Sequence, residues 1–120
     1  MSQTSATWTL LDAAAQARAF PTSFTIPSHR VRSSLGVSDL VKVCLVRKTR
    51  LDGIAPAGER LWCAIEAVRT PLRSRVVYYG ALRNLPVVFT ELGYGSPIVF
   101  GPEHVLDVEE RCRSQAGGAD

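Results

Sequence analysis

The chain has 120 residues, of which 46% are hydrophobic and 21% are charged. This length fits one domain, residues 1–120, and this composition is typical of a globular protein with its own core. The formal net charge of +3 permits contact with nucleic acid or an acidic surface without requiring it. No apolar run approaches the roughly 20 residues of a membrane span, and the N-terminus lacks a secretory signal pattern. We therefore expect a cytoplasmic protein without membrane contact, with disordered polar ends at 1–6 and 109–120.

Cysteine usage indicates a reduced compartment and no metal centre. Cys44, Cys63 and Cys112 are odd in number and widely spaced, and neither His29 nor His104 lies near any of them in sequence. This spacing does not match a zinc site, and no nucleotide-binding motif is present, so we predict neither a metal nor a cofactor. Cys44 and Cys63 lie within apolar segments and are expected to be small core residues, whereas Cys112 is expected to be an exposed thiol.

Two helical segments are predicted in the N-terminal third of the chain. Residues 10–18 are rich in alanine and leucine, which favours a short amphipathic helix with Thr9 as its cap and Pro21 at its end. After an extended stretch, Ser28 can cap one or two further helical turns that Gly36 closes. Both segments are short, so we expect them to pack on the same domain.

The rest of the chain predicts short antiparallel strands. Runs of β-branched and aromatic residues separated by turn residues favour strands at 39–47, 60–68, 74–82, 86–89, 98–100 and 105–107. Gly80, inside the third of these, is expected to mark a bulge or bend. Closely spaced strands of this kind favour a small barrel, because closure removes exposed edges. The predicted fold class is α+β, a short N-terminal helix with a small antiparallel SH3-like barrel; an open sheet is the alternative.

Five segments together resemble a widespread bacterial family. They are 26–28, 35–43, 58–62, 80–86 and 101–107. Their order and spacing, across roughly residues 24 to 108, resemble the family catalogued as domain of unknown function twenty-three fourteen. The resemblance implies a small soluble bacterial domain, similar in outline to barrel-like interaction domains, and carries over no activity or site residue. The chain departs from the family pattern at Ser38 and in the longer loop before Gly58.

Four residues are the candidates for a ligand site. Trp62 offers a large apolar surface with one N–H donor, and Arg60 would lie at the rim of the same pocket. The competing interpretation, which we favour for Trp62, is that its side chain points inward and fills the barrel. Asn84 can present its amide to a ligand or bond its own backbone in the turn before Pro86. His104, between carboxylates in sequence, is the fourth candidate.

A second set of residues is the candidate for a nucleic-acid surface. It comprises the basic side chains of two stretches, Arg47, Lys48, Arg50, Arg69, Arg73 and Arg75. Arginines near Tyr78 and Tyr79 can contact phosphates while an aromatic ring stacks on a base. Adjacent strand residues point to opposite faces, however, so the two tyrosines cannot form one platform. Nucleic-acid binding is therefore the weaker alternative, and it requires these cations to form one face.

Catalysis has little support in the sequence. His104, with Glu103 and Asp107, is the one grouping suited to acid–base chemistry, but no nucleophile motif accompanies it. The leading hypothesis is a non-enzymatic interaction module that binds a protein or peptide. The alternatives are weak nucleic-acid binding and an enzyme that uses His104. The oligomeric state is left open.

Overall fold

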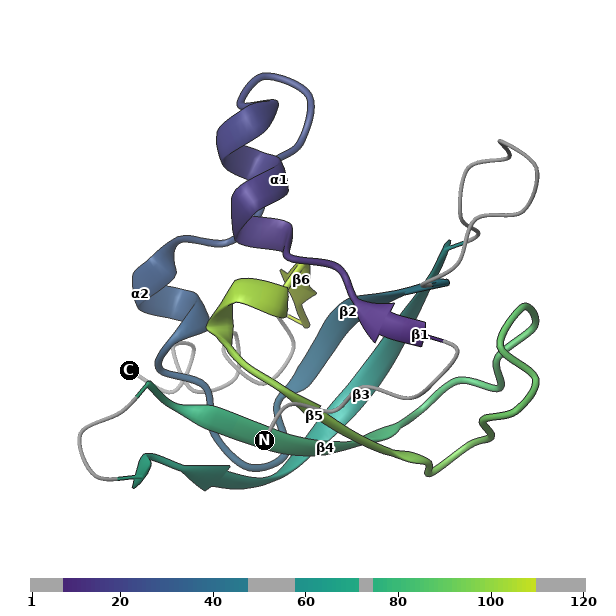
Figure 1. Cartoon of the computed structure of the whole chain (residues 1–120). Helices are drawn as coiled ribbons and strands as arrows, with labels where there is room; N and C mark the ends of the chain where they lie inside the picture. The colour runs from purple at the N-terminus through teal and green to yellow at the C-terminus, as the bar shows by residue number, and fades with distance from the viewer. Residues whose placement is uncertain (1–7, 48–57, 72–74, 110–120) are drawn as a thin grey trace, which may run out of the picture.

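The computed structural model describes residues 8–47, 58–71 and 75–109 (Figure 1). Its strands are β1 (Trp8–Leu10), β2 (Leu40–Arg47), β3 (Gly58–Arg69), β4 (Val77–Leu82), β5 (Pro97–Phe100) and β6 (Asp107–Val108). Its helices are α1 (Ala13–Ala19), α2 (His29–Arg32) and the short 3₁₀ helix η2 (Pro102–His104). Apart from Glu109, whose backbone N–H donates to the Leu40 carbonyl, the predicted disordered ends lie outside the described residues.

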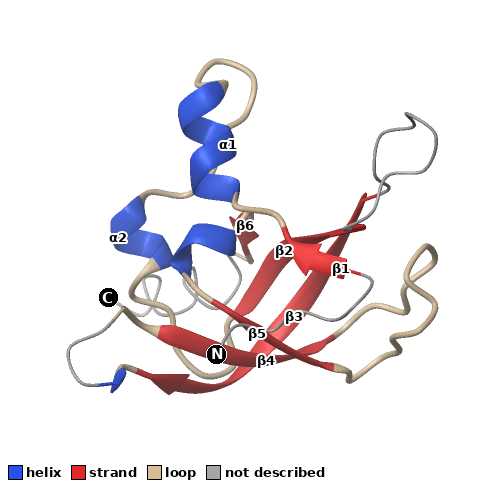
Figure 2. Ribbon diagram, in the orientation of Figure 1, coloured by secondary structure: helices blue, strands red, loops and turns tan. Residues whose placement is uncertain are grey.

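The strands form one antiparallel sheet that curls into a half-barrel (Figure 2). The order is β1-β2-β3-β4-β5, and β6 pairs with β2 along the edge that β1 also uses. Neighbours in sequence are mostly neighbours in the sheet, as short hairpin connections favour. A barrel-like α+β fold is therefore confirmed at this level.

The main core lies on the inner face of the curled sheet. Alternate residues of β2 and β3 point there because side chains in a strand alternate between faces. Val41, Val43 and Leu45 of β2 are fully buried, as is Cys63 of β3. Both Cys44 and Cys63 are free and buried, which confirms their prediction as core residues. Cys112 lies outside the described residues.

The N-terminal helix begins later than predicted. Residues 8–10 form β1 instead, and Trp8 is 2% exposed against the sheet. The helix starts after Asp12, whose Oδ1 accepts a hydrogen bond of 2.9 Å from the Ala15 N–H. Thr9 lies in the strand, so its predicted capping role is wrong. Pairing with the far end of β2 overrides the helical preference of residues 10–12.

The second helical segment follows its prediction at its start. Ser28 caps α2, and its Oγ accepts a hydrogen bond of 3.2 Å from the Val31 N–H. The helix ends at Arg32, several residues before Gly36. Asp39 closes the following turn, since its Oδ2 accepts from the Gly36 N–H at 2.9 Å.

The predicted strand at 86–89 is absent, and this segment is a loop. Its backbone N–H groups at Val87, Val88 and Phe89 all donate to the carboxylate of Glu59, over 2.8–3.2 Å. In a β-strand, successive N–H groups point to opposite sides of the strand. Three successive N–H groups that all point to one carboxylate therefore cannot belong to a strand. The irregularity expected at Gly80 lies on the opposite strand, between Ile65 and Ala67.

A second, smaller apolar cluster covers the outer face of β2. It consists of Ala13, Cys44 and Leu106, with Leu11, Phe24, Ile26 and Val46 packed against them. This cluster attaches α1 and the segment after it to the sheet, on the side where Figure 1 shows both helices. The outer face is thus covered in part, and its remaining area forms the candidate site.

Candidate functional site

Three polar or aromatic side chains lie in one row across the outer face of the sheet. Lys42 of β2 is directly opposite Trp62 of β3 and, on its other side, Asp107 of β6. Directly opposite residues share a face, so the Trp62 side chain points away from the main core. The favoured interpretation that Trp62 fills the barrel is therefore wrong. Leu61 and Cys63, on either side of it, fill that space instead.

Lys42 and Arg60 supply positive charge to this outer face. The Lys42 Nζ lies 5.0 Å from the centre of the Trp62 ring, a cation–π contact. Arg60, two residues before Trp62, is opposite Cys44 and exposed to solvent. Among the described residues, no carboxylate forms an ion pair with either cation.

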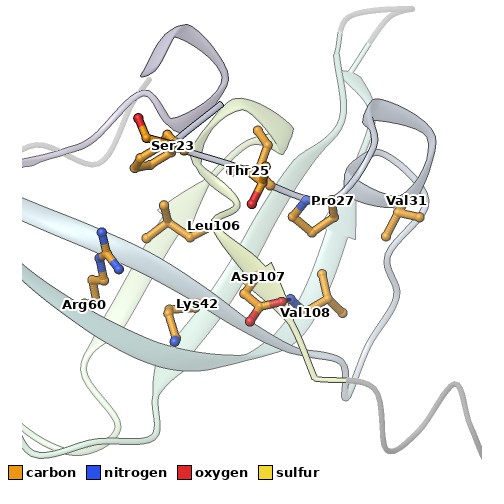
Figure 3. A pocket seen from close by; sticks show the side chains of 11 residues that line it. Ser23, Thr25, Pro27, Val31, Lys42, Arg60, Leu106, Asp107 and Val108 are labelled. Carbon is orange, nitrogen blue, oxygen red and sulfur yellow. Dashed lines mark hydrogen bonds between the residues drawn. The ribbon is translucent and has the colours of Figure 1, made fainter. Parts of the chain in front are cut away.

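A groove of about 660 Å³ runs along this face. We call it the sheet groove: residues 23–27 and Val31 form one wall, and Lys42, Arg60 and residues 106–108 form the other. Figure 3 shows Lys42 and Arg60 on the sheet, across from the segment that carries Ser23, Thr25 and Pro27. The groove therefore combines walls of mixed apolar and polar residues with two cations on the sheet side.

Of the residues that the structure describes, Asp107 is the one acidic residue that lines the groove. Its Oδ1 accepts a hydrogen bond of 2.8 Å from the Val108 N–H, so one oxygen is occupied by the backbone. The formal charge of the lining is therefore two cations against one anion. This excess favours a ligand that carries negative charge.

Asn84 contacts the backbone of the candidate site. Its Oδ1 accepts a hydrogen bond of 2.7 Å from the Trp62 N–H. The backbone N–H of Arg83 donates to the Trp62 carbonyl at 2.8 Å, so the chain after β4 is tied to Trp62 on both sides. Asn84 thus positions β3 and does not line the sheet groove.

His104 lies in η2, away from the sheet groove. Its Nδ1 accepts a hydrogen bond of 3.0 Å from the Gly101 N–H, which requires a neutral ring with Nδ1 unprotonated. Burial lowers the pKa of His104 and Arg75 lowers it further, against the opposite effects of Glu103 and Asp12. The imidazole therefore stabilises the turn into η2. Of the four predicted ligand residues, only Arg60 lines the groove, and Trp62 adjoins it through Lys42.

The described members of the basic set do not lie together. Arg47 is paired with Glu91 at 2.6 Å, and its guanidinium lies over the Phe89 ring. Arg69 is at the opposite end of β3, next to β4. Arg75 lines a separate cavity beside the helices. Lys48, Arg50 and Arg73 lie outside the described residues.

Tyr78 and Tyr79 point to opposite faces, as predicted: Tyr78 is fully buried and Tyr79 is 42% exposed. The arginines and tyrosines that the structure describes therefore do not form the single basic, aromatic surface that nucleic-acid binding needs.

Sequence reasoning missed Lys42 and the wall formed by residues 23–27. Lys42 has a visible signal, because it is the one charged residue inside the apolar run 40–46. A lysine there must lie on the outer face, since the alternate positions Val41 and Val43 are buried. No comparable signal marks residues 23–27, whose position depends on contacts with Cys44 and Leu106.

Comparison with known proteins gives no further information on this site. No family model matches the chain, and neither curated proteins nor solved structures give a match. The family resemblance therefore stays a prediction. In the described part of the chain, no helix is long and apolar enough to cross a membrane. No three metal-ligating side chains gather there either.

Proposed function

We propose that the protein is a non-enzymatic interaction module that binds an extended, acidic peptide segment of a partner protein in the sheet groove. The observation that carries this proposal is a groove of mixed apolar and polar residues that holds two cations with no acidic partner among the described residues. An SH3-like barrel, which the curled antiparallel sheet supports, and a cytoplasmic location belong to the same proposal.

The shape of the groove supports an extended ligand. Residues 23–27 form a wall of consecutive residues along the sheet, and this arrangement suits a linear chain more than a compact molecule. Its half-buried apolar residues, Phe24, Ile26 and Val31, offer apolar surface to alternate side chains of an extended peptide. The remaining side chains of such a peptide would point toward the sheet cations.

The charges of the groove support an acidic ligand. Arg60 is exposed and can form a two-pronged contact with a carboxylate, and the Lys42 ammonium is within reach of the same face. Asp107 would repel an acidic side chain at the β6 end, so the acidic residues of the ligand would lie toward Lys42 and Arg60. Half-buried Trp62 restricts Lys42 through the cation–π contact, which limits the entropy lost when a ligand binds.

The test is selection from a displayed heptapeptide library on the full-length protein, followed by titration of the selected peptides. We expect enrichment of peptides that alternate apolar and acidic residues. The double variant Lys42→Glu, Arg60→Glu should bind them at least about tenfold more weakly, because both charges are reversed. The matched pair is Arg60→Glu and the control Arg69→Glu, which makes the same single charge reversal on the same strand outside the groove.

Three results would contradict the proposal. The first is a selection with no enrichment above an empty surface. The second is a set of peptides that bind the double variant and the wild type equally well. A fall in affinity of the same size in Arg69→Glu would show that only net charge matters, and this result also counts against the groove.

A further inference from the structure

A second cavity, of about 470 Å³, lies where α1, α2, η2 and the start of β4 meet. Its lining includes Arg18, Arg32, Arg75 and Glu103, so three positive charges face one negative charge. The formal charge of the cavity lining is therefore +2, three positive charges minus one negative charge. We call this the arginine cavity. It shares no lining residue with the sheet groove.

Arg32 is a buried cation with no counter-ion in the described part of the chain. The residue as a whole is only 9% exposed to solvent. Nε donates to the Pro27 carbonyl at 2.8 Å, and Nη1 donates to the Pro102 carbonyl at 2.9 Å. Among the described residues, no carboxylate pairs with it, and no acceptor contacts Nη2. A buried charge of this kind is costly unless an anion is supplied.

The other charged residues leave that need unmet. Arg18 and Arg75 are exposed, and neither forms an ion pair within the part of the chain that the structure describes. The Glu103 carboxylate lies 3.7 Å from the Nε2 of His104, so it is directed toward the imidazole. The cavity therefore offers three guanidinium groups against one carboxylate.

We propose that the arginine cavity binds the phosphate group of a small, soluble phosphomonoester. A phosphate dianion matches the excess of +2, and guanidinium groups bind phosphate oxygens in pairs. The cavity exceeds the volume of a phosphate alone, and Ala14, Val76 and Pro102 supply an apolar wall for the group that the phosphate esterifies. The fixed guanidinium of Arg32 would contact the anion at the inner end.

The experiment is isothermal titration of the full-length protein with inorganic phosphate, ribose 5-phosphate and ribose. We expect ribose 5-phosphate to bind more tightly than inorganic phosphate and ribose not to bind. Arg18→Gln and Arg75→Gln should each weaken ribose 5-phosphate binding about tenfold, the effect of losing one charge-assisted contact. Arg83→Gln, an exposed arginine beside Tyr94, is the matched control and should bind as the wild type does.

Arg32 is not the first variant to make, because its two bonds to backbone carbonyls also support the fold. The two exposed arginines avoid this difficulty, and thermal unfolding of each variant checks that it is folded. Absence of saturable binding by either phosphate compound would overturn the proposal, as would equal losses in Arg83→Gln and Arg75→Gln. Tighter binding of inorganic phosphate than of the ester would overturn the assignment to a phosphomonoester. None of these results bears on the sheet groove.

Discussion

The hydroxyl of Tyr78 donates a hydrogen bond of 2.8 Å to the backbone carbonyl of Arg32. The same oxygen accepts a hydrogen bond of 3.2 Å from the Leu35 N–H. Tyr78 is fully buried in the main core, so this contact ties the end of α2 to β4. Arg32 is thereby fixed through its backbone by Tyr78 and through its guanidinium by Pro27 and Pro102.

We expect Tyr78→Phe to lower the free energy of unfolding by about 1–3 kcal/mol, because a buried carbonyl and a buried N–H lose their partner. Urea denaturation followed by circular dichroism measures the change. Tyr79→Phe is the control, since Tyr79 lies on the opposite face and is 42% exposed. Equal stability of the two variants would show that water replaces the Tyr78 hydroxyl.

Glu59 fixes the loop after β4 through its three backbone contacts at residues 87–89. We expect Glu59→Ala to lower the free energy of unfolding by about 1–2 kcal/mol and to speed hydrogen exchange of the amides at 87–89. Glu66→Ala, on the exposed side of the same strand, is the control. Unchanged exchange in that loop would show that Glu59 does not order it.

The Glu59 contacts also predict a dependence on pH. Burial raises the pKa of Glu59, but the hydrogen bonds from Val87, Val88 and Phe89 outweigh burial and bring the pKa below its usual 4.5. As the pH falls toward 4.5, the Glu59 carboxylate takes up its proton in the unfolded chain before it does so in the folded protein. The free energy of unfolding therefore decreases as the pH falls. Denaturation midpoints measured downward from about pH 5 should fall more steeply for the wild type than for Glu59→Ala. Parallel slopes would contradict this role.

The strands that the sequence predicts best are those whose period is visible locally. Segments 39–47 and 60–68 become β2 and β3 with shifts of one or two residues at their ends. β1 could not be predicted, because three residues carry no period and become a strand only by pairing with residues 45–47. The loop at 86–89 was equally hidden, since Glu59, far away in sequence, accepts the hydrogen bonds that a neighbouring strand would have accepted.

The candidate site was predicted in part, for a related reason. Residues 61–65 are apolar throughout, so alternation could not indicate which face Trp62 occupies. Arg60 was predicted at the rim of a pocket beside Trp62; it lines the sheet groove, and its binding of a ligand stays a prediction. Nothing local marks Arg32, one of several arginines, as the buried one. Its burial results from carbonyls at Pro27 and Pro102 that the fold brings together.

Gly80 lies where two strands approach closely. A Cβ at this position would lie 2.9 Å from the Ala64 carbonyl oxygen and 3.3 Å from a ring carbon of Phe100. We expect Gly80→Ala to lower the free energy of unfolding by about 1–3 kcal/mol, because the backbone atom cannot give way without disturbing the sheet. Gly36→Ala is the control, since a Cβ there meets no atom within 4 Å. If the two variants unfolded at the same denaturant concentration, the close approach of the strands at Gly80 would be contradicted.

His104 predicts a second dependence of stability on pH, in a higher range. Burial, together with Arg75, brings its pKa below the usual 6.5 although Glu103 and Asp12 act in the opposite direction. Nδ1 now accepts a hydrogen bond from the Gly101 N–H. Protonation of Nδ1 would remove this hydrogen bond, because two N–H groups would then face each other. The unfolded chain gains its proton at the higher pH, so stability is complete above 6.5 and falls as the pH drops below it.

Thermal unfolding between about pH 7.5 and 5.5 measures the effect of His104. The wild type should lose stability across this interval, and His104→Gln should lose less, from a lower starting value. His29→Gln is the matched control, because His29 is exposed on α2 and should leave the wild-type dependence unchanged. If His104→Gln retained the full wild-type dependence, another group would be responsible for it. The role of the imidazole as a neutral acceptor in η2 would then be wrong.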